Sequence, residues 1–161
     1  MALDLVAELE ALVDALHRED VDYAVCGGLA LAMHGHPRAT MDIDLLVAEA
    51  RVDDVLRIAR TIGFDVPARR MTFGLRAGRP RVVHRVSKLD ADTQDLLPLD
   101  VLVVSPELAP VWADRVELVV GSRRIAVVSR EGLATMKRIA GRPQDLADLA
   151  ALEGNADDEL E

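Results

Sequence analysis

The chain has 161 residues, half of them hydrophobic, with one cysteine and a formal net charge of -9 at pH 7. The acidic balance opposes non-specific attraction to nucleic-acid phosphates, and two Phe, one Tyr and one Trp leave little for stacking on bases. This length suits one well-cored domain and is short for two. We therefore expect a single domain over residues 1–154, followed by a frayed acidic tail over 155–161.

The sequence contains no run of eighteen or more apolar residues. Its start, Met-Ala-Leu-Asp, lacks the basic and apolar parts of a secretion signal. We expect a cytoplasmic protein with no membrane contact. Cys26 lies in an apolar segment, which predicts a small buried side chain and not a nucleophile.

Hydrophobic periodicity predicts helices and strands that alternate along the chain. The predicted helices cover residues 4–18, 28–35 and 51–62, a short segment around Trp112, and two closing segments that begin after Ser129 and at Pro143. The predicted strands cover residues 22–26, 42–48 and 98–104, with two hairpins that pair 71–75 with 81–87 and 116–120 with 123–128.

Three aspartates in apolar strands carry the strongest chemical signal. Asp42 and Asp44 are separated by one residue, so they project to the same face of a strand, and Asp100 lies in a later strand. Adjacent anions are tolerated when a cation or a proton is shared between them. Oxygen ligands without a His or Cys cluster favour Mg²⁺ or Mn²⁺ over zinc. If the two strands are neighbours, the three carboxylates converge on one metal pocket.

Gly27 and Gly28 follow an apolar strand and open a predicted helix. Such a turn lets the backbone approach a ligand, and the free N–H groups of the helix attract an anion. Taken alone, a glycine pair is more often only a tight turn. Its position fourteen residues before Asp42 favours a phosphate-binding role.

Further candidate binding residues flank these motifs. Arg38 and Thr40 precede the acidic pair, and Arg38 either neutralises triphosphate charge or pairs with a carboxylate of the metal site. Lys137, on a later helix, is either a phosphate contact or a solvated lysine. Asp145 and Asp148 share a helix face and either reach the site or form salt bridges with nearby arginines.

Residues 69–88 contain six Arg, one Lys, His84 and no acidic residue. This strip is either a solvated, charged hairpin or a docking surface for RNA, phosphates or an acidic partner.

The order and spacing of these motifs resemble the nucleotidyltransferase signature of the DNA polymerase β superfamily. The chain looks most like the small bacterial nucleotidyltransferases related to the AbiEii-type toxins of toxin-antitoxin systems, and the resemblance spans about residues 21–152. The segments that carry it are Gly27-Gly28-Leu29-Ala30, Arg38-Ala39-Thr40-Met41-Asp42-Ile43-Asp44-Leu45, Leu99-Asp100-Val101 and the lysine helix with its Arg-x-x-Asp-x-x-Asp-Leu continuation over 133–149.

The resemblance implies an α/β (α+β) nucleotidyltransferase fold, a mixed sheet flanked by helices, with further helices at the C-terminus. It also implies transfer of a nucleoside monophosphate from an NTP with Mg²⁺ (or Mn²⁺). The acceptor would be tRNA or a protein, and an antitoxin-like protein would be a partner. The implied catalytic and metal-binding residues are Asp42, Asp44 and Asp100, and the implied nucleotide-binding residues are Gly27, Gly28, Arg38, Thr40 and Lys137.

Two other functions are compatible with the same residues. A binding module could keep the nucleotide pocket without turnover and act through a partner protein. An Asp-x-Asp motif also occurs at metal sites of nucleotide-sugar glycosyltransferases, but the chain is short for that fold and the glycine pair would have no role there.

Overall fold

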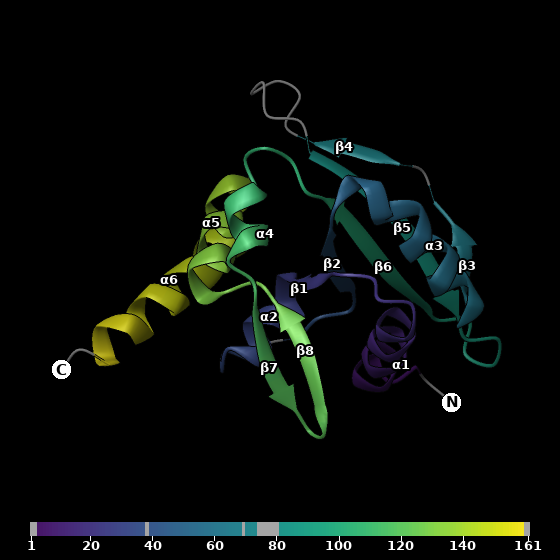
Figure 1. The fold of residues 1–161 in the computed structure, drawn as a ribbon. Helices are drawn as coiled ribbons and strands as arrows, with labels where there is room; N and C mark the ends of the chain where they lie inside the picture. The colour runs from purple at the N-terminus through teal and green to yellow at the C-terminus, as the bar shows by residue number, and fades with distance from the viewer. Residues whose placement is uncertain (1–2, 38, 69, 74–80, 160–161) are drawn as a thin grey trace.

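The computed structural model describes residues 3–37, 39–68, 70–73 and 81–159, with only the backbone described over 155–159. Helices surround a single β-sheet, and the two ends of the chain lie far apart, on opposite sides of the view in Figure 1.

Helices and strands alternate as far as α3, and four consecutive strands follow it. The helices are α1 (Leu5–Arg18), α2 (Gly27–Met33), α3 (Val52–Thr61), α4 (Ala109–Ala113), α5 (Arg130–Ala140) and α6 (Pro143–Glu159), and a 3₁₀ turn, η1 (Glu49–Arg51), precedes α3. The strands are β1 (Ala24–Cys26), β2 (Ile43–Val47), β3 (Phe64–Pro67), β4 (Met71–Phe73), β5 (Arg81–Leu89), β6 (Leu96–Val103), β7 (Val116–Val120) and β8 (Arg123–Val127). Strand β3 was not predicted. It is short and ends in a proline, which is tolerated because β3 lies at the edge of the sheet.

The strand order is β3-β5-β6-β2-β1-β8-β7, and β4 pairs with β5 outside this path. β2 runs parallel to β6 and β1 runs parallel to β8, whereas the other pairs are antiparallel. The predicted mixed sheet is therefore confirmed. The expected neighbourhood of the two strands that carry aspartates is also confirmed, because Asp44 of β2 lies opposite Asp100 of β6.

Helix α1 packs on one face of the sheet, close to α3 (Figure 1). It begins after Asp4, whose carboxylate accepts hydrogen bonds from two N–H groups of the first turn. Leu12 and Leu16 on its apolar side are fully buried. Lys88 of β5 donates to Glu8 of α1 at 2.8 Å, which fixes the helix to this face.

Helices α4, α5 and α6 gather at the other end of the molecule (Figure 1). The hydroxyl of Ser129 accepts from the Gly132 N–H and caps α5, as predicted. Gly141 ends α5 with φ +64°, and α6 begins at Pro143. In the described part of the chain, no helix has the length and hydrophobicity needed to cross a membrane.

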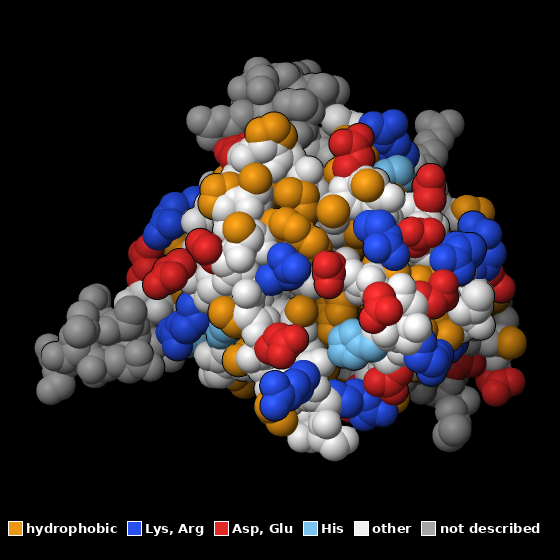
Figure 2. All heavy atoms as spheres, viewed as in Figure 1, with side chains coloured by type: hydrophobic (Ala, Val, Ile, Leu, Met, Phe, Trp, Pro, Cys, Tyr) orange, Lys and Arg blue, Asp and Glu red, His pale blue; other side chains and the backbone are white. Residues whose placement is uncertain are grey.

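Acidic and basic side chains are interspersed on the face shown in Figure 2. Many form ion pairs between elements, such as Arg57 of α3, which donates to Glu19 at 3.0 Å. Exposed pairs of this kind contribute little to stability.

Candidate active site

One residue from each of four adjacent strands forms a row across the sheet. Asp44 of β2 lies opposite Cys26 of β1 and opposite Asp100 of β6, and Asp100 in turn lies opposite Arg85 of β5. Residues in direct register share a face of the sheet, so these four side chains point to the same side. Asp42 precedes Asp44 by two residues, just before β2 begins. We call the three aspartates Asp42, Asp44 and Asp100 the acidic row.

The acidic row lines a pocket of about 580 Å³, a volume typical of small-molecule sites. Another part of the wall is apolar and comes from Met41, Met71 and Phe73, beside Arg81. Seven of the eight site residues predicted from the sequence line this pocket: Gly27, Gly28, Thr40, Asp42, Asp44, Asp100 and Lys137. The structure therefore brings together motifs that are far apart along the chain.

Gly27 and Gly28 both lie against the segment that leads into β2 and carries the Asp-x-Asp motif. Gly27 has φ +66°, and a Cβ added there would collide with Oδ2 of Asp44. A Cβ added to Gly28 would lie 2.8 Å from Oγ1 of Thr40. The missing side chains thus allow the start of α2 to lie directly against the loop that leads into β2.

Cys26 borders the pocket from β1 but is only 1% exposed. Burial raises the pKa of its thiol well above the usual value. The side chain is a small buried residue, as predicted, and is not a thiolate nucleophile.

The surroundings of Asp44 disfavour its ionised form. Burial, followed by the negative charges of Asp100 and Asp42, raises the pKa of Asp44 to about 7. Lys137 and Arg85 act in the opposite direction and do not cancel this effect. Near neutral pH, the site therefore favours either a proton or a further cation at Asp44.

Arg85 holds Asp100 with two hydrogen bonds. Its Nε donates to Oδ1 at 2.7 Å and its Nη2 donates to Oδ2 at 2.9 Å. Nη2 also lies 3.9 Å from Oδ2 of Asp42. These contacts raise the pKa of Arg85 above its usual value, mainly through the hydrogen bonds to Asp100.

The donor set of the acidic row suits a magnesium-like cation. Within the described ranges, no three His, Cys, Asp or Glu side chains are arranged to hold a metal ion as they stand. Mg²⁺ usually takes one or two carboxylates and completes its shell with water and substrate phosphates. Asp42 and Asp44 meet this requirement, and the raised pKa of Asp44 reflects a carboxylate that a cation would stabilise.

Lys137 is buried and paired, so the interpretation as a solvated lysine is wrong. Only 5% of it is exposed, and its Nζ lies 3.0 Å from Oδ2 of Asp148 and 3.4 Å from Oδ1 of Asp145. Asp145 also accepts from Nε of Arg142 at 2.6 Å, the salt bridge that was one alternative for this residue. These contacts join α5 to α6 at the pocket wall.

The predicted basic strip over 69–88 does not form one continuous surface in the described part of the chain. Arg81 and Arg85 line the pocket, whereas Lys88 points to the opposite face and pairs with Glu8. The reason is that alternate strand residues point to opposite faces. Four arginines of the predicted motifs lie outside the described residues: Arg38, Arg69, Arg76 and Arg79.

Sequence reasoning did not single out Arg85, although the signal was present. β5 and β6 are consecutive antiparallel strands joined by a tight loop, in which the Asp90 N–H donates to the Asp95 carbonyl at 2.8 Å. Counting outward equally from this loop brings Arg85 opposite Asp100. This register would then have marked Arg85 as a partner of the carboxylate.

The architecture is shared with solved nucleotidyltransferases. A protein from Thermotoga maritima, TM1012, with a provisional nucleotidyltransferase assignment, is 17% identical, with a TM-score of 0.66 over 93% of this chain and 92% of that one. The lincosamide antibiotic adenylyltransferase LnuA, solved with lincomycin bound, is 17% identical, with a TM-score of 0.58 over 91% of this chain and 95% of that one. ANT(2")-Ia, solved with adenylyl-2"-tobramycin, is 15% identical, with a TM-score of 0.59 over 96% of this chain and 92% of that one. At these identities the likeness establishes the fold, that of the nucleotidyltransferases.

A family model extends this assignment from the fold to the sequence. It matches residues 2–153, and the chain belongs to that family, the nucleotidyltransferases of unknown function designated DUF6036. A comparison with curated proteins gave no match.

Proposed function

We propose that this protein transfers a nucleoside monophosphate from an NTP to a hydroxyl or phosphate acceptor and releases pyrophosphate, with Mg²⁺ (or Mn²⁺) as the cofactor. The observation that carries the proposal is the acidic row. Its Asp44, whose ionisation is disfavoured, lies in register with Asp100 and against Gly27, inside a pocket of about 580 Å³.

The reaction forms a bond between the acceptor oxygen and the α-phosphorus and breaks the bond from that phosphorus to the bridging oxygen. Pyrophosphate leaves with the electron pair, and the acceptor loses a proton. A bound divalent cation would supply neutralisation of phosphate charge and activation of the acceptor oxygen. Asp42, Asp44 and Asp100 would hold the cation, and Asp100 would help to take the proton of the acceptor.

The remaining residues position the nucleotide. Gly27 and Gly28 offer backbone N–H groups to the phosphates at a point where no side chain intervenes. Thr40 lies against Gly28 and limits the movement of the loop before Asp42. We assign Lys137 a role through its charge on the pocket wall, because both of its carboxylate partners hold the ammonium group there.

Arg38 stays a predicted nucleotide-binding residue on the strength of its spacing from the acidic pair. In this role, its guanidinium neutralises triphosphate charge or pairs with a carboxylate of the acidic row.

The acceptor is proposed from two classes. The AbiEii-like motifs favour tRNA or a protein as the acceptor, a toxin-like role and an antitoxin-like partner. The structural relatives LnuA and ANT(2")-Ia adenylylate or bind antibiotics, which favours the hydroxyl of a small molecule. The apolar wall of Met41, Met71 and Phe73 supports an acceptor with an apolar surface beside its reacting group.

The proposal is tested with each α-labelled NTP, Mg²⁺ and, in parallel, total RNA, a protein extract or a panel of aminoglycosides and lincosamides. The parent should transfer label to one of these acceptors. The Asp42→Asn/Asp44→Asn variant should lose transfer by roughly a thousandfold or more, since the charges that hold the cation are gone.

The matched control is Asp14→Asn/Glu10→Gln, which removes two carboxylates around Arg123, between α1 and β8. It should transfer label at the parental rate. Transfer by the acidic-row variant at the parental rate would overturn the assignment, and so would a folded parent that transfers no label from any NTP to any of these acceptors.

A second candidate is a nucleotide-binding module that acts through a partner protein without turnover. The contact that favours it is the one between Arg85 and Asp100, which occupies both oxygens of one carboxylate of the acidic row. Binding of an NTP with no pyrophosphate release against any of the acceptors above would select this function over transfer.

A further inference from the structure

Arg85 lies where the acidic row would receive its cation. Its guanidinium forms a two-bond fork with Asp100 and extends to 3.9 Å from Asp42. Such forks between guanidinium and carboxylate are among the stronger charged hydrogen bonds in proteins. The side chain is 36% exposed and lines the pocket, so space exists on one side into which it can move.

The contact between Arg85 and Asp100 bears on how the acidic row can bind a cation. Arg85 contacts two of the three carboxylates of the acidic row, Asp100 through the fork and Asp42 at 3.9 Å. While Arg85 donates to both oxygens of Asp100, a metal ion cannot bind these oxygens from the side of the guanidinium. A divalent cation and the guanidinium therefore compete for the same carboxylate.

We propose that Arg85 is a resident counter-cation of the acidic row, which keeps Asp100 in place in the metal-free protein and must release it when a divalent cation binds. Arg85 is thus a positioning residue that sets the metal affinity of the site. The inference rests on the proposed function, because it requires the acidic row to be a metal site.

Mn²⁺ alone is the probe, because free Mn²⁺ is counted directly by electron paramagnetic resonance and needs no turnover. The experiment titrates it into the parent, Arg85→Gln and Arg85→Lys. Arg85→Gln should bind Mn²⁺ about tenfold more tightly than the parent, since the competing charge is gone. Arg85→Lys should lie between them, because an ammonium keeps the charge but not the fork.

Arg123→Gln is the matched control. Arg123 is 35% exposed and also holds an aspartate, Asp14, through its Nε, so this variant loses the same charge from the same kind of contact. It should bind Mn²⁺ with the parental affinity. A tighter affinity in both glutamine variants would mean a general charge effect and would overturn the inference.

The inference and the proposed function fail in different ways. Suppose that Asp42→Asn/Asp44→Asn abolishes Mn²⁺ binding but folded Arg85→Gln binds Mn²⁺ no more tightly than the parent. This result overturns the role of Arg85 and leaves the proposed metal site intact. Parental Mn²⁺ binding that the acidic-row variant does not change overturns both. If Arg85→Gln does not fold, Arg85→Lys decides, since tighter binding by this variant than by the parent supports competition and unchanged binding contradicts it.

Discussion

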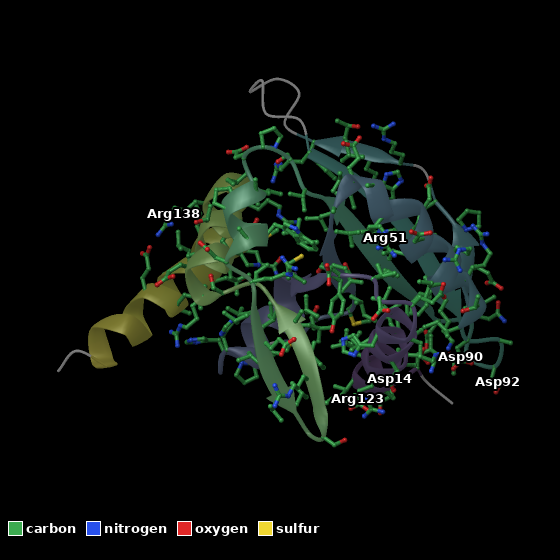
Figure 3. The ribbon with its side chains drawn as sticks, in the orientation of Figure 1. Asp14, Arg51, Asp90, Asp92, Arg123 and Arg138 are labelled. Carbon is green, nitrogen blue, oxygen red and sulfur yellow. The ribbon has the colours of Figure 1, made fainter. Side chains whose placement is uncertain are left out.

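Two clusters in this protein each join one arginine to two carboxylates, and they have different consequences. Arg123 contacts Asp14 and Glu10 of α1, close to the turn of the β7–β8 hairpin (Figure 3). Arg85 contacts Asp100 and Asp42 in the pocket. The hydrogen bonds from Arg123 lower the pKa of Asp14, whereas the pKa of Asp44, beside the Arg85 cluster, is raised to about 7.

The difference comes from burial and from one additional carboxylate. At the α1 cluster each charge has a partner and solvent access, so the contacts do no more than join a helix to a strand. In the pocket, a third carboxylate, Asp44, forms no ion pair with another described residue, and burial together with the neighbouring anions makes its ionisation costly. Like charges placed side by side in a pocket, and not ion pairing as such, distinguish a candidate site from a surface contact.

The largest loss of stability is expected where two buried carboxylates lose the cation that pairs with them. Lys137→Met leaves Asp145 and Asp148 buried without their shared ammonium, and we expect the free energy of unfolding to fall by about 3–5 kcal/mol. Arg138→Met breaks an exposed pair with Glu153 between the same two helices and should cost about 1 kcal/mol or less. Urea denaturation of both variants measures the contrast, and equal losses would contradict it.

The pH dependence of stability separates the two clusters by sign. Because the pKa of Asp44 is raised from 3.8 to about 7, the folded state binds the extra proton and loses stability as pH rises from about 4 through 7. Asp44→Asn should remove this loss, about 2 kcal/mol by pH 8, less than the full shift because the pocket admits solvent. Urea denaturation of parent and variant at a series of pH values gives the difference.

Asp14→Asn is the counterpart in the same experiment. The lowered pKa of Asp14 means that its contribution is present above pH 4 and is lost as pH falls below that value. Between pH 5 and pH 8, this variant should therefore parallel the parent. A parallel curve for Asp44→Asn over the same range would refute the charge argument at the acidic row.

Two glycines with nearly equal φ angles allow a substitution in the pocket to be compared with the same substitution in the β7–β8 hairpin. Gly27 has φ +66° and touches Asp44, whereas Gly121, in the β7–β8 turn, has φ +63° and open space around it. Alanine at either position should cost about 1–2 kcal/mol of backbone strain. Only Gly27→Ala should reduce nucleotidyl transfer, by about a hundredfold, because its Cβ displaces the Asp44 carboxylate; thermal melts and label transfer read out the two effects.

The smallest effect is expected at the α1 cluster itself. Arg123→Gln removes contacts that are about one-third exposed, and we expect a loss of at most about 1 kcal/mol that shrinks further in 1 M salt. Thermal melts at low and high salt measure it. A loss comparable to that of Lys137→Met would mean that exposure does not decide the strength of these clusters.

Much of the fold follows from local pattern. The α1 spacing, the Ser129 cap and the Gly141 and Pro143 break between the last two helices are encoded within a few residues of where they act. The edge strand β3 escaped prediction because four residues with a terminal proline carry too little periodicity. Its pairing with β5, and not its own sequence, makes it a strand.

The candidate site likewise has a part that the sequence predicts and a part that only the structure shows. The sequence by itself identified Asp42, Asp44 and Asp100 as a set, since carboxylates in apolar strands need a reason to be there. Only the tertiary structure decided that Arg85 pairs with Asp100 and that Lys137 is held by two aspartates. Residue types and spacing fix which chemistry is available, but register and burial are long-range outcomes, and they determine which charges are compensated and which are left for a ligand.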